Sequence, residues 1–310
     1  MSQVLIVGSL ALDSVETPFG QRDPALGGAG LYAAAAASLL APVHLVGVIG
    51  EDFPPEALAT LAARGVDLGG VQQVAGGKSF HWAGRYTYAM DAAETLDTQL
   101  NVFADFDPQV PPAARESEYV FLANITPALQ LQVLEQMSGP RLTVCDTMNY
   151  WIEHARGDLL RVLERVDGAA MNDAEVRQLT GTPNLARAAR EVLDLGPRFL
   201  LLKKGEYGAS LVTREAHFAL PCYPLPNVFD PTGAGDSFAG GFMGYLAWSD
   251  ATDEAALRQA VAIGTVTASA CVEDFSWDSL LRLSVEDLYA RYEELRQMVS
   301  FDACPLGKEQ

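Results

Sequence analysis

The residues best suited to chemistry lie in one short stretch near position 230. It reads DPTGAGDSFAGGF from Asp230 to Phe242. Within it, Asp230-Pro231-Thr232 predicts an extended turn, Gly233-Ala234-Gly235 predicts a tight backbone corner, and Asp236 falls in the first turn of a helix. The first N–H groups of that helix lack intrahelical partners, and together with the helix dipole they favour an anion such as a phosphate.

Asp236 adds a proton acceptor beside this anion site. A base next to donors that stabilise negative charge is what transfer of a phosphoryl group to a hydroxyl requires. A structural interpretation stays open beside the catalytic one. Aspartate is common in a first helical turn for dipole reasons alone, and glycine-rich helices often serve only close packing.

The composition indicates a globular protein and excludes several classes of partner. The chain has 310 residues, 49% of them hydrophobic, which is enough for a large core. Its formal net charge of -19 repels nucleic acid and anionic membranes, so neither is an expected partner. The four cysteines show no C-x-x-C spacing and the four histidines form no H-E-x-x-H pair, which argues for free thiols and against zinc.

The N-terminus begins directly with an apolar segment and has no basic region of the kind that opens a signal peptide. The longest mostly apolar run, around residues 31 to 43, is too short to span a bilayer. We therefore expect a cytoplasmic protein.

The rest of the chain alternates apolar strands with helices. Continuous apolar runs predict strands buried on both faces, and the alternation predicts an α/β fold with a mostly parallel central sheet and helices on both faces. We expect a single domain over residues 1–310, with a small β lid from about 14–26 and 76–104. The predicted strands are 4–7, 43–49, 119–124, 142–146, 168–172 and two within 199–212, and the predicted helices are 31–41, 55–64, 127–137, 155–165, 173–180, 184–195, 254–272 and 284–299.

Polar residues and glycines follow several of these strands. Asp13 comes just after the first strand, where ligands of open α/β sheets collect, so its carboxylate can accept hydrogen bonds from the hydroxyls of a substrate. Asn124 and Asp146 also fall at strand ends, where polar side chains can point into the cleft. Each can equally cap the next turn. Gly27-Gly28 precedes the helix 31–41, where glycine permits either close approach to a substrate or close packing on the sheet.

Two further groups are candidates for contacts with phosphate. Asn172 and Glu175 start the helix 173–180, and a capping box explains their spacing without any ligand. Lys203 and Lys204 are the only adjacent lysines in this acidic chain. One of them is a candidate phosphate contact, and solvated surface lysines are the alternative.

Taken together, these motifs resemble the ribokinase (pfkB) family of sugar and nucleoside kinases. The stretch from Asp230 to Phe242 carries the resemblance, and Asp13, Gly27-Gly28, the N-x-x-E of Asn172 and Glu175, and Gly205 follow the family order over nearly the whole chain. The resemblance implies an ATP-dependent kinase that acts on a hydroxyl of a small sugar, with a nucleoside as the alternative acceptor. An alternative from a different class is a nucleotide or sugar sensor that has this fold and no turnover.

The resemblance also implies a role for each matching residue. Asp236 deprotonates the acceptor, and the N–H groups of Gly233, Ala234 and Gly235 stabilise the transferring phosphoryl group. The expected acceptor contacts are Asp13, Gly27, Gly28, Tyr32 and Asn124. Mg²⁺ is held through water by Asn172 and Glu175, and the expected nucleotide contacts are these two residues with Lys203, Gly205, Thr232, Gly235, Ala262 and Thr265.

The chain departs from the family pattern at two places. Tyr32 stands where the family has a substrate-binding asparagine, and a phenol lacks the paired donor and acceptor of an amide. After the helix 254–272, Asp274-Phe275-Ser276 replaces a turn that belongs to the family's monovalent-cation site, so K⁺ is an open question as a cofactor. We also expect a homodimer formed through the lid, because an aromatic flap face needs cover.

Overall fold

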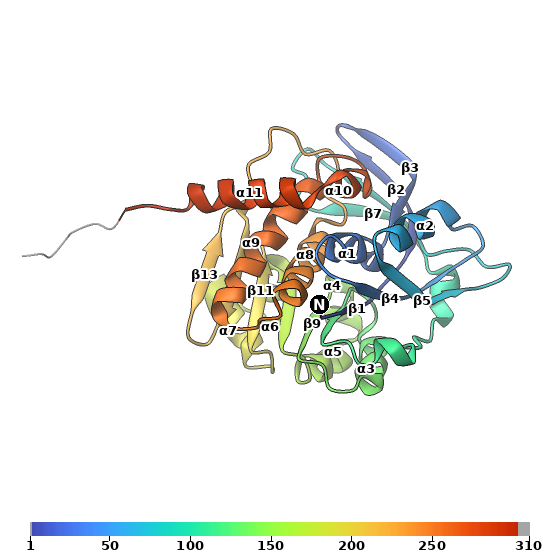
Figure 1. Ribbon diagram of the computed structural model, residues 1–310, viewed down its shortest axis with the longest axis horizontal. Coiled ribbons are helices and arrows are strands. Elements are labelled where there is room, and N and C mark those ends of the chain that lie inside the picture. The colour runs from blue at the N-terminus through green and yellow to red at the C-terminus, as the bar shows by residue number, and fades with distance from the viewer. Residues whose placement is uncertain (1, 303–310) are drawn as a thin grey trace, which may run out of the picture.

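A large sheet and a small sheet form the framework of the molecule (Figure 1). The structure is a computed structural model and describes residues 2–302. The large sheet has nine strands in the order β13-β12-β11-β10-β9-β8-β1-β4-β5, and the small one has four in the order β3-β2-β6-β7. Of the ladders in the large sheet, only β11–β12 and β12–β13 are antiparallel. The predicted mostly parallel sheet is confirmed.

Most strands of the large sheet are short apolar segments, and the parallel strands end at the same edge. β1, with the sequence VLIV, is buried along its whole length. Its side chains alternate between the two faces of the sheet, with Val4 and Ile6 in one core and Leu5 and Val7 in the other. The strands are β1 Val4–Val7, β4 Val43–Ile49, β5 Val66–Gln73, β8 Tyr119–Leu122, β9 Leu142–Asp146, β10 Gly168–Asn172, β11 Phe199–Lys203, β12 Ala209–Thr213 and β13 His217–Leu220.

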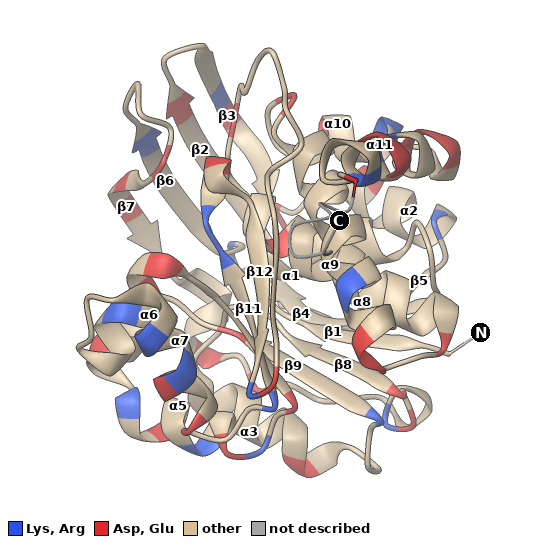
Figure 2. Ribbon diagram, turned by 90° about the vertical axis from the view of Figure 1, so that its left-hand side faces the viewer, with Lys and Arg blue, Asp and Glu red and all other residues tan. Residues whose placement is uncertain are grey.

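Helices cover both faces of this sheet (Figure 2). On one face lie α1 Ala29–Ala37, α8 Ala234–Ser249 and α9 Glu254–Cys271, with α2 Pro55–Ala63, α10 Asp278–Arg282 and α11 Val285–Met298 around them. On the other face lie α3 Pro127–Gln136, α5 Arg156–Leu163, α6 Asp173–Thr180 and α7 Leu185–Leu193, and α4 Asn149–His154 packs beside α6. The Ala-rich α1 is buried throughout, since small side chains let it pack closely between the sheet and α8.

The small sheet stands out from the edge of the large sheet (Figure 2). Its strands are β2 Ala11–Thr17, β3 Gly20–Gly27, β6 His81–Tyr86 and β7 Ala93–Gln99. The predicted lid segments 14–26 and 76–104 therefore meet in one sheet, although they are far apart in sequence. Arg85 lies on the exposed side, paired with Glu16 at 3.0 Å.

Some predicted boundaries were wrong. The helix predicted over 31–41 is Ala29–Ala37, whereas the one predicted near 155–165 is α5, and α4 before it was not predicted. Residues 100–103, predicted as extended, lead into a 3₁₀ helix, η1 Asn101–Asp105, in which Phe103 packs between Phe80 and Phe106. β5, β13 and α10 were not predicted. β5 reads VDLGGVQQ, and its two glycines hide any alternation of apolar and polar residues.

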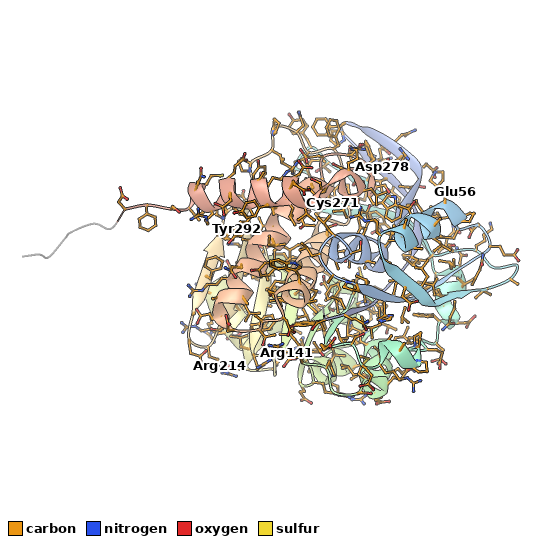
Figure 3. The ribbon with its side chains drawn as sticks, viewed as in Figure 1. Glu56, Arg141, Arg214, Cys271, Asp278 and Tyr292 are labelled. Atoms are coloured by element: carbon orange, nitrogen blue, oxygen red, sulfur yellow. The ribbon has the colours of Figure 1, made fainter. Side chains whose placement is uncertain are left out.

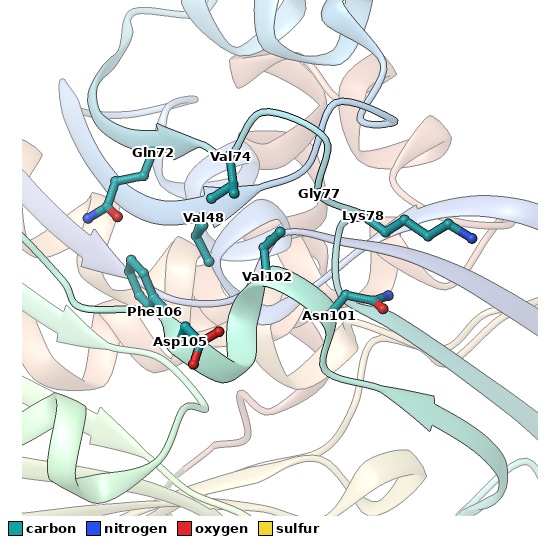
Figure 4. Close-up of a pocket in the computed structure, with 9 residues that line it drawn as sticks. All are labelled: Val48, Gln72, Val74, Gly77, Lys78, Asn101, Val102, Asp105 and Phe106. Atoms are coloured by element: carbon teal, nitrogen blue, oxygen red, sulfur yellow. The ribbon is translucent and has the colours of Figure 1, made fainter.

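Three further observations describe the molecule outside the predicted site. A hollow of about 310 Å³ lies between β5 and η1 (Figure 4), and none of the predicted site residues lines it. No helix among residues 2–302 is long and apolar enough to cross a membrane. Cys145, Cys222 and Cys271 are free thiols, as predicted, and Cys304 lies outside the described residues.

Candidate active site

The glycine corner opens α8 as the sequence predicted. Asp230 accepts a hydrogen bond from the N–H of Thr232 at 2.9 Å, which closes the preceding turn. Gly233 caps the helix with φ of 77°, a left-handed conformation that glycine adopts without strain. No side chain caps this helix, and within residues 2–302 the N–H groups of Gly233 and Gly235 have no acceptor. The N–H of Ala234 differs from the prediction, because it already bonds to the carbonyl of Pro231 at 3.2 Å.

Asp236 lies in the first turn of α8, beside these free N–H groups. Burial raises the pKa of its carboxyl to about 7, and the charge of Asp146 adds to the rise while Lys203 opposes it. A carboxyl group with a pKa near neutrality is suited to accept a proton from a hydroxyl at physiological pH.

Lys203 extends from the end of β11 and places its ammonium group among carboxylates. Its Nζ donates to Oδ2 of the buried Asp146 at 2.7 Å. Burial alone would lower the pKa of Lys203, but the charges of Asp146 and Glu175 outweigh it and raise that pKa well above its usual value. Lys203 is only 17% exposed, so it is not the solvated surface lysine that the sequence left open.

Asn172 and Glu175 form the capping box of α6. Glu175 accepts from the backbone N–H and from the side-chain amide of Asn172, each at 2.7 Å, and Asn172 accepts from the Glu175 N–H at 2.8 Å. Burial raises the pKa of Glu175 to about 7, against the lowering effect of Lys203. Within residues 2–302 no group of three or more His, Cys, Asp or Glu residues is arranged to hold a metal ion.

Asp13, on β2 of the small sheet, forms the second carboxylate centre. It is 4% exposed, and burial raises its pKa to about 7, although the N–H of Trp82 donates to it at 3.3 Å. A Cβ atom on Gly27 would lie 1.9 Å from Oδ2 of Asp13, so only glycine leaves room for this carboxylate. Gly28, with φ of 98°, makes the turn into α1.

Tyr32 and Asn124 are engaged by the protein itself. Tyr32 is 2% exposed, and its ring packs against the corner, where a Cβ atom on Gly233 would fall 2.4 Å from the ring. The oxygen of Asn124 accepts from the indole N–H of Trp151 at 2.9 Å, and its amide donates to the sulfur of Met148 at 3.3 Å. Tyr32 thus packs against the glycine corner. Direct contact of Tyr32 or Asn124 with an acceptor remains a prediction.

The predicted nucleotide contacts lie on three elements. Gly205 starts the short helix η3 Gly205–Tyr207 with φ of 54° and open space around it. Ala262 and Thr265 face inward on α9, 9% and 7% exposed. The hydroxyl group of Thr232 donates to Tyr86 of β6 at 3.3 Å, a bond that joins the corner to the lid.

Sequence reasoning missed three residues of this site. Asp146 was noted only as a polar strand end, and the role of Asp230 in closing the turn was not foreseen. Burial raises the pKa of Asp230, which accepts from Thr232 and from the N–H of Ser276 at 3.1 Å. Tyr86 belongs to the aromatic flap predicted over 76–104; burial raises its pKa to about 12, and its hydroxyl group meets that of Thr232. Behind the corner, Cys271 (labelled in Figure 3) donates to the carbonyl of Thr232 at 3.6 Å.

A family model supplies the deciding observation. The model of the pfkB family of carbohydrate kinases matches residues 20–279. The chain belongs to this family. Its members are phosphotransferases that use ATP and act on hydroxyl groups of sugars and nucleosides. The ATP-dependent kinase predicted from the sequence is therefore confirmed at the level of the family.

Individual relatives and solved structures agree with the assignment to the pfkB family. A cytidine kinase of Thermococcus kodakarensis is 32% identical over 249 residues, which cover 78% of this chain and 88% of that protein. The fold matches a nucleoside kinase of Burkholderia thailandensis solved with inosine, with a TM-score of 0.80, 20% identity and coverage of 94% of this chain and 97% of that one. It also matches an E. coli protein of the ribokinase II type solved with ATP and Mg²⁺, with a TM-score of 0.77, 18% identity and coverage of 95% and 100%. The fold is therefore ribokinase-like.

Proposed function

We propose that this pfkB-family kinase transfers the γ-phosphoryl group of ATP to a hydroxyl of a nucleoside. The observation that carries the chemistry is the position of Asp236 in the first turn of α8, beside the free N–H groups of Gly233 and Gly235. Asp236 takes the proton of the acceptor hydroxyl, and the N–H groups stabilise the charge on the transferring phosphoryl group. The buried Asp13 orients the acceptor by accepting hydrogen bonds from its other hydroxyls.

Two observations favour a nucleoside over the free sugar that the sequence suggested first. The cytidine kinase is similar over most of both chains. In addition, few polar side chains remain for a small sugar, because Tyr32 is turned under the corner and the amide of Asn124 is engaged by Trp151 and Met148. The backbone N–H of Trp82 donates to Asp13, and the half-buried ring of Trp82 on the lid offers a surface on which a base can stack.

Mg²⁺ fits this site through water. Both oxygens of Glu175 accept from Asn172, and each keeps a lone pair that can accept from a water bound to Mg²⁺. Contact through bound water leaves the box intact, as proposed for Asn172 and Glu175. When bound, Mg²⁺ neutralises part of the triphosphate charge.

K⁺ has less support, and we propose that turnover does not depend on it. Both oxygens of Asp230 accept backbone N–H groups, one from Thr232 and one from Ser276 in the segment that replaces the family's turn. Each oxygen of Asp230 is thus held by a backbone donor, one of them in the segment that replaces the turn of the family's cation site. A cytoplasmic location also remains a prediction, consistent with the use of ATP.

We also propose a homodimer formed through the lid. β7 is the edge of the small sheet and is exposed over nearly its whole length, so it can pair with a second lid. Leu96 and Leu100 are 49% and 47% exposed near this edge and would gain cover. Sedimentation at micromolar concentration should give twice the monomer mass, and Leu96→Lys should shift it to the monomer. A monomeric wild-type protein under these conditions contradicts the proposal.

The test of the kinase proposal is ADP release from Mg-ATP with a panel of acceptors. The panel contains cytidine, uridine, adenosine and inosine beside ribose, fructose and ribose 1-phosphate. We expect turnover with a nucleoside and its near-complete loss in Asp236→Asn. The matched control is Asp105→Asn, which removes an exposed carboxylate far from the corner in sequence and should retain activity.

The alternatives give different results in the same assay. Turnover with a sugar alone would return the acceptor to the class first predicted from the sequence. Binding of ATP and of a nucleoside without turnover would favour the sensor. Full activity in Asp236→Asn would remove Asp236 from the role of base.

A further inference from the structure

The candidate site contains many carboxylates and one cation. Five carboxyl groups gather at the carboxyl edge of the sheet and the corner, namely Asp13, Asp146, Glu175, Asp230 and Asp236. Of the lysines and arginines in residues 2–302, Lys203 alone forms an ion pair with one of them. A triphosphate brings several more negative charges, so the position of this ammonium group matters for the reaction.

The sheet order determines how Lys203 reaches its partner. Asp146 ends β9 and Lys203 ends β11, and β10 runs between these two strands. Asp146 is aligned with Ala170 of β10, whereas Lys203 is aligned with Asn172, two residues further along. The lysine side chain therefore crosses the end of β10 and lies back over it to meet the carboxylate.

Both carboxylate oxygens of Asp146 accept hydrogen bonds from the protein. Its Oδ1 accepts from the N–H of Thr147 at 2.8 Å and its Oδ2 accepts from Lys203 at 2.7 Å. The buried Gln130 donates to the carbonyl of Asp146 at 2.9 Å and also to two carbonyls at the end of β8. At 3% exposure, Asp146 has no free surface for a ligand, so its contact with Lys203 is its evident use.

The ammonium group thus held lies directly at the glycine corner. A Cβ atom on Gly235 would lie 3.2 Å from Nζ of Lys203, and the three atoms nearest to that position all belong to the Lys203 side chain. The N–H of Gly235 is one of the two free donors of the corner. A phosphate oxygen bound by this N–H would therefore meet the ammonium group as well.

We propose that Asp146 is a positioning residue that holds the ammonium group of Lys203 beside Gly235, where it meets the γ-phosphoryl group as that group is transferred. This inference rests on the proposed phosphoryl transfer. In that step the acceptor oxygen forms a bond to Pγ, the bond from Pγ to the β,γ-bridging oxygen breaks with its electrons going to ADP, and the hydroxyl proton goes to Asp236. Lys203 keeps its proton throughout and contributes charge only.

The first test compares ATP with ADP, because only ATP has a γ-phosphoryl group. Calorimetry without acceptor should show that Lys203→Met weakens Mg-ATP binding by about 10-fold or more, the range for a lost charge-assisted hydrogen bond. Mg-ADP binding should change less than about two-fold, which also shows that the variant is folded. Asp146→Asn should give the same pattern with a smaller loss, because the lysine remains but its position is no longer fixed. Lys204→Met is the matched control and should bind both nucleotides like the wild type, because Lys204 forms no ion pair in residues 2–302.

The second test is the pH profile of kcat/KM, measured with the acceptor that gives turnover. The titratable groups around Asp236 are Asp13 of β2, Tyr32 of α1, Asp146 of β9, Glu175 of α6, Lys203 of β11 and Cys271 of α9. Loss of the Asp146 charge lowers the pKa of Asp236, so the acidic limb of Asp146→Asn should move to lower pH. Loss of the Lys203 charge raises that pKa, so the limb of Lys203→Met should move to higher pH, each by on the order of one unit. A purely structural defect would not move the limb in opposite directions.

The outcomes separate this inference from the proposed function. No turnover with any acceptor would refute the proposed function, and the comparison of ATP with ADP would still test Lys203. Equal loss of ATP and ADP affinity in Lys203→Met would overturn the inference, as would a larger effect in Lys204→Met. Acidic limbs that shift in the same direction in both variants would show that Asp146 and Lys203 do not act as a pair on Asp236.

Discussion

Replacing Asp13 by asparagine separates what this carboxyl group does to the fold from what it does for the acceptor. Asp13 is 4% exposed, and burial raises its pKa from 3.8 to about 7. The folded state therefore binds a proton at Asp13 more tightly than the unfolded state does. Asp13 therefore leaves the free energy of folding unaffected below pH 3.8. It makes folding less favourable as the pH rises toward 7, and its effect is constant above that.

The size of the effect follows from the shift. Each pKa unit corresponds to about 1.4 kcal/mol, so the ionised carboxylate destabilises the folded state by up to about 4 kcal/mol at pH 8. Asparagine has nearly the same shape and no charge, but its amide N–H groups would lie close to Gly27 with no evident acceptor. This unpaired amide offsets part of the stability gained by removing the charge. We therefore expect Asp13→Asn to be more stable than the wild type by about 2 kcal/mol at pH 8.

Urea unfolding at pH 5, 6, 7 and 8 measures this difference. The gain should grow from pH 5 to pH 7 and then level off, while the KM for the acceptor rises because a carboxylate that accepts its hydroxyls is lost. Asp105→Asn controls for the removal of one charge from a chain with a net charge of -19. A variant less stable than the wild type at pH 8, or a gain in stability that does not depend on pH, would show that burial does not disfavour the ionised form of Asp13.

Three further predictions follow from the same site. Because burial raises the pKa of both Asp13 and Asp236 to about 7, kcat/KM should rise with pH up to about 7 with a slope above one, and Asp13→Asn should reduce that slope to one. Gly233→Ala should lose more stability than Gly181→Ala, since both have positive φ but only a Cβ atom on Gly233 would meet the ring of Tyr32; equal losses would contradict that packing. Replacing K⁺ by choline should leave kcat unchanged, and a fall of 10-fold or more would show a cation site that Asp230 does not supply.

The parts of the fold that the sequence predicts well are those decided by local patterns. The strands 142–146 and 168–172 were predicted to the residue, because each is an apolar run that ends in a polar residue. The capping box of Asn172 and Glu175 was visible from its spacing of three. Where the local signal is weak, the boundaries moved. Helix α1 has no side-chain cap and consists of residues that suit any buried helix, so tertiary packing alone sets its ends.

Contacts between distant strands could not be predicted in this way. Asp146 and Lys203 are 57 positions apart and lie on strands separated by a third, so no spacing in the sequence connects them. Lys203 is the last residue of β11 and Lys204 caps the short helix η3 that follows, so the sequence could not show which of the two adjacent lysines reaches the site until the strand boundary was known. Tyr32 was predicted to contact the acceptor from its position in a motif, but the direction of α1 turns its ring under Gly233.

The buried carboxyl groups give one physical link between stability and activity in this site. Burial raises the pKa values of Asp13, Glu175 and Asp236 to about 7, so ionising any of them weakens the folded state. The same ionised groups are the ones that would accept hydrogen bonds and a proton from the substrate. The ammonium group of Lys203 opposes the rise in the pKa of Glu175 and of Asp236, but it has no such effect on the pKa of Asp13. Hence loss of its cation should affect the phosphoryl side of the site more than the acceptor side, because the ammonium group of Lys203 opposes the rise only on the phosphoryl side.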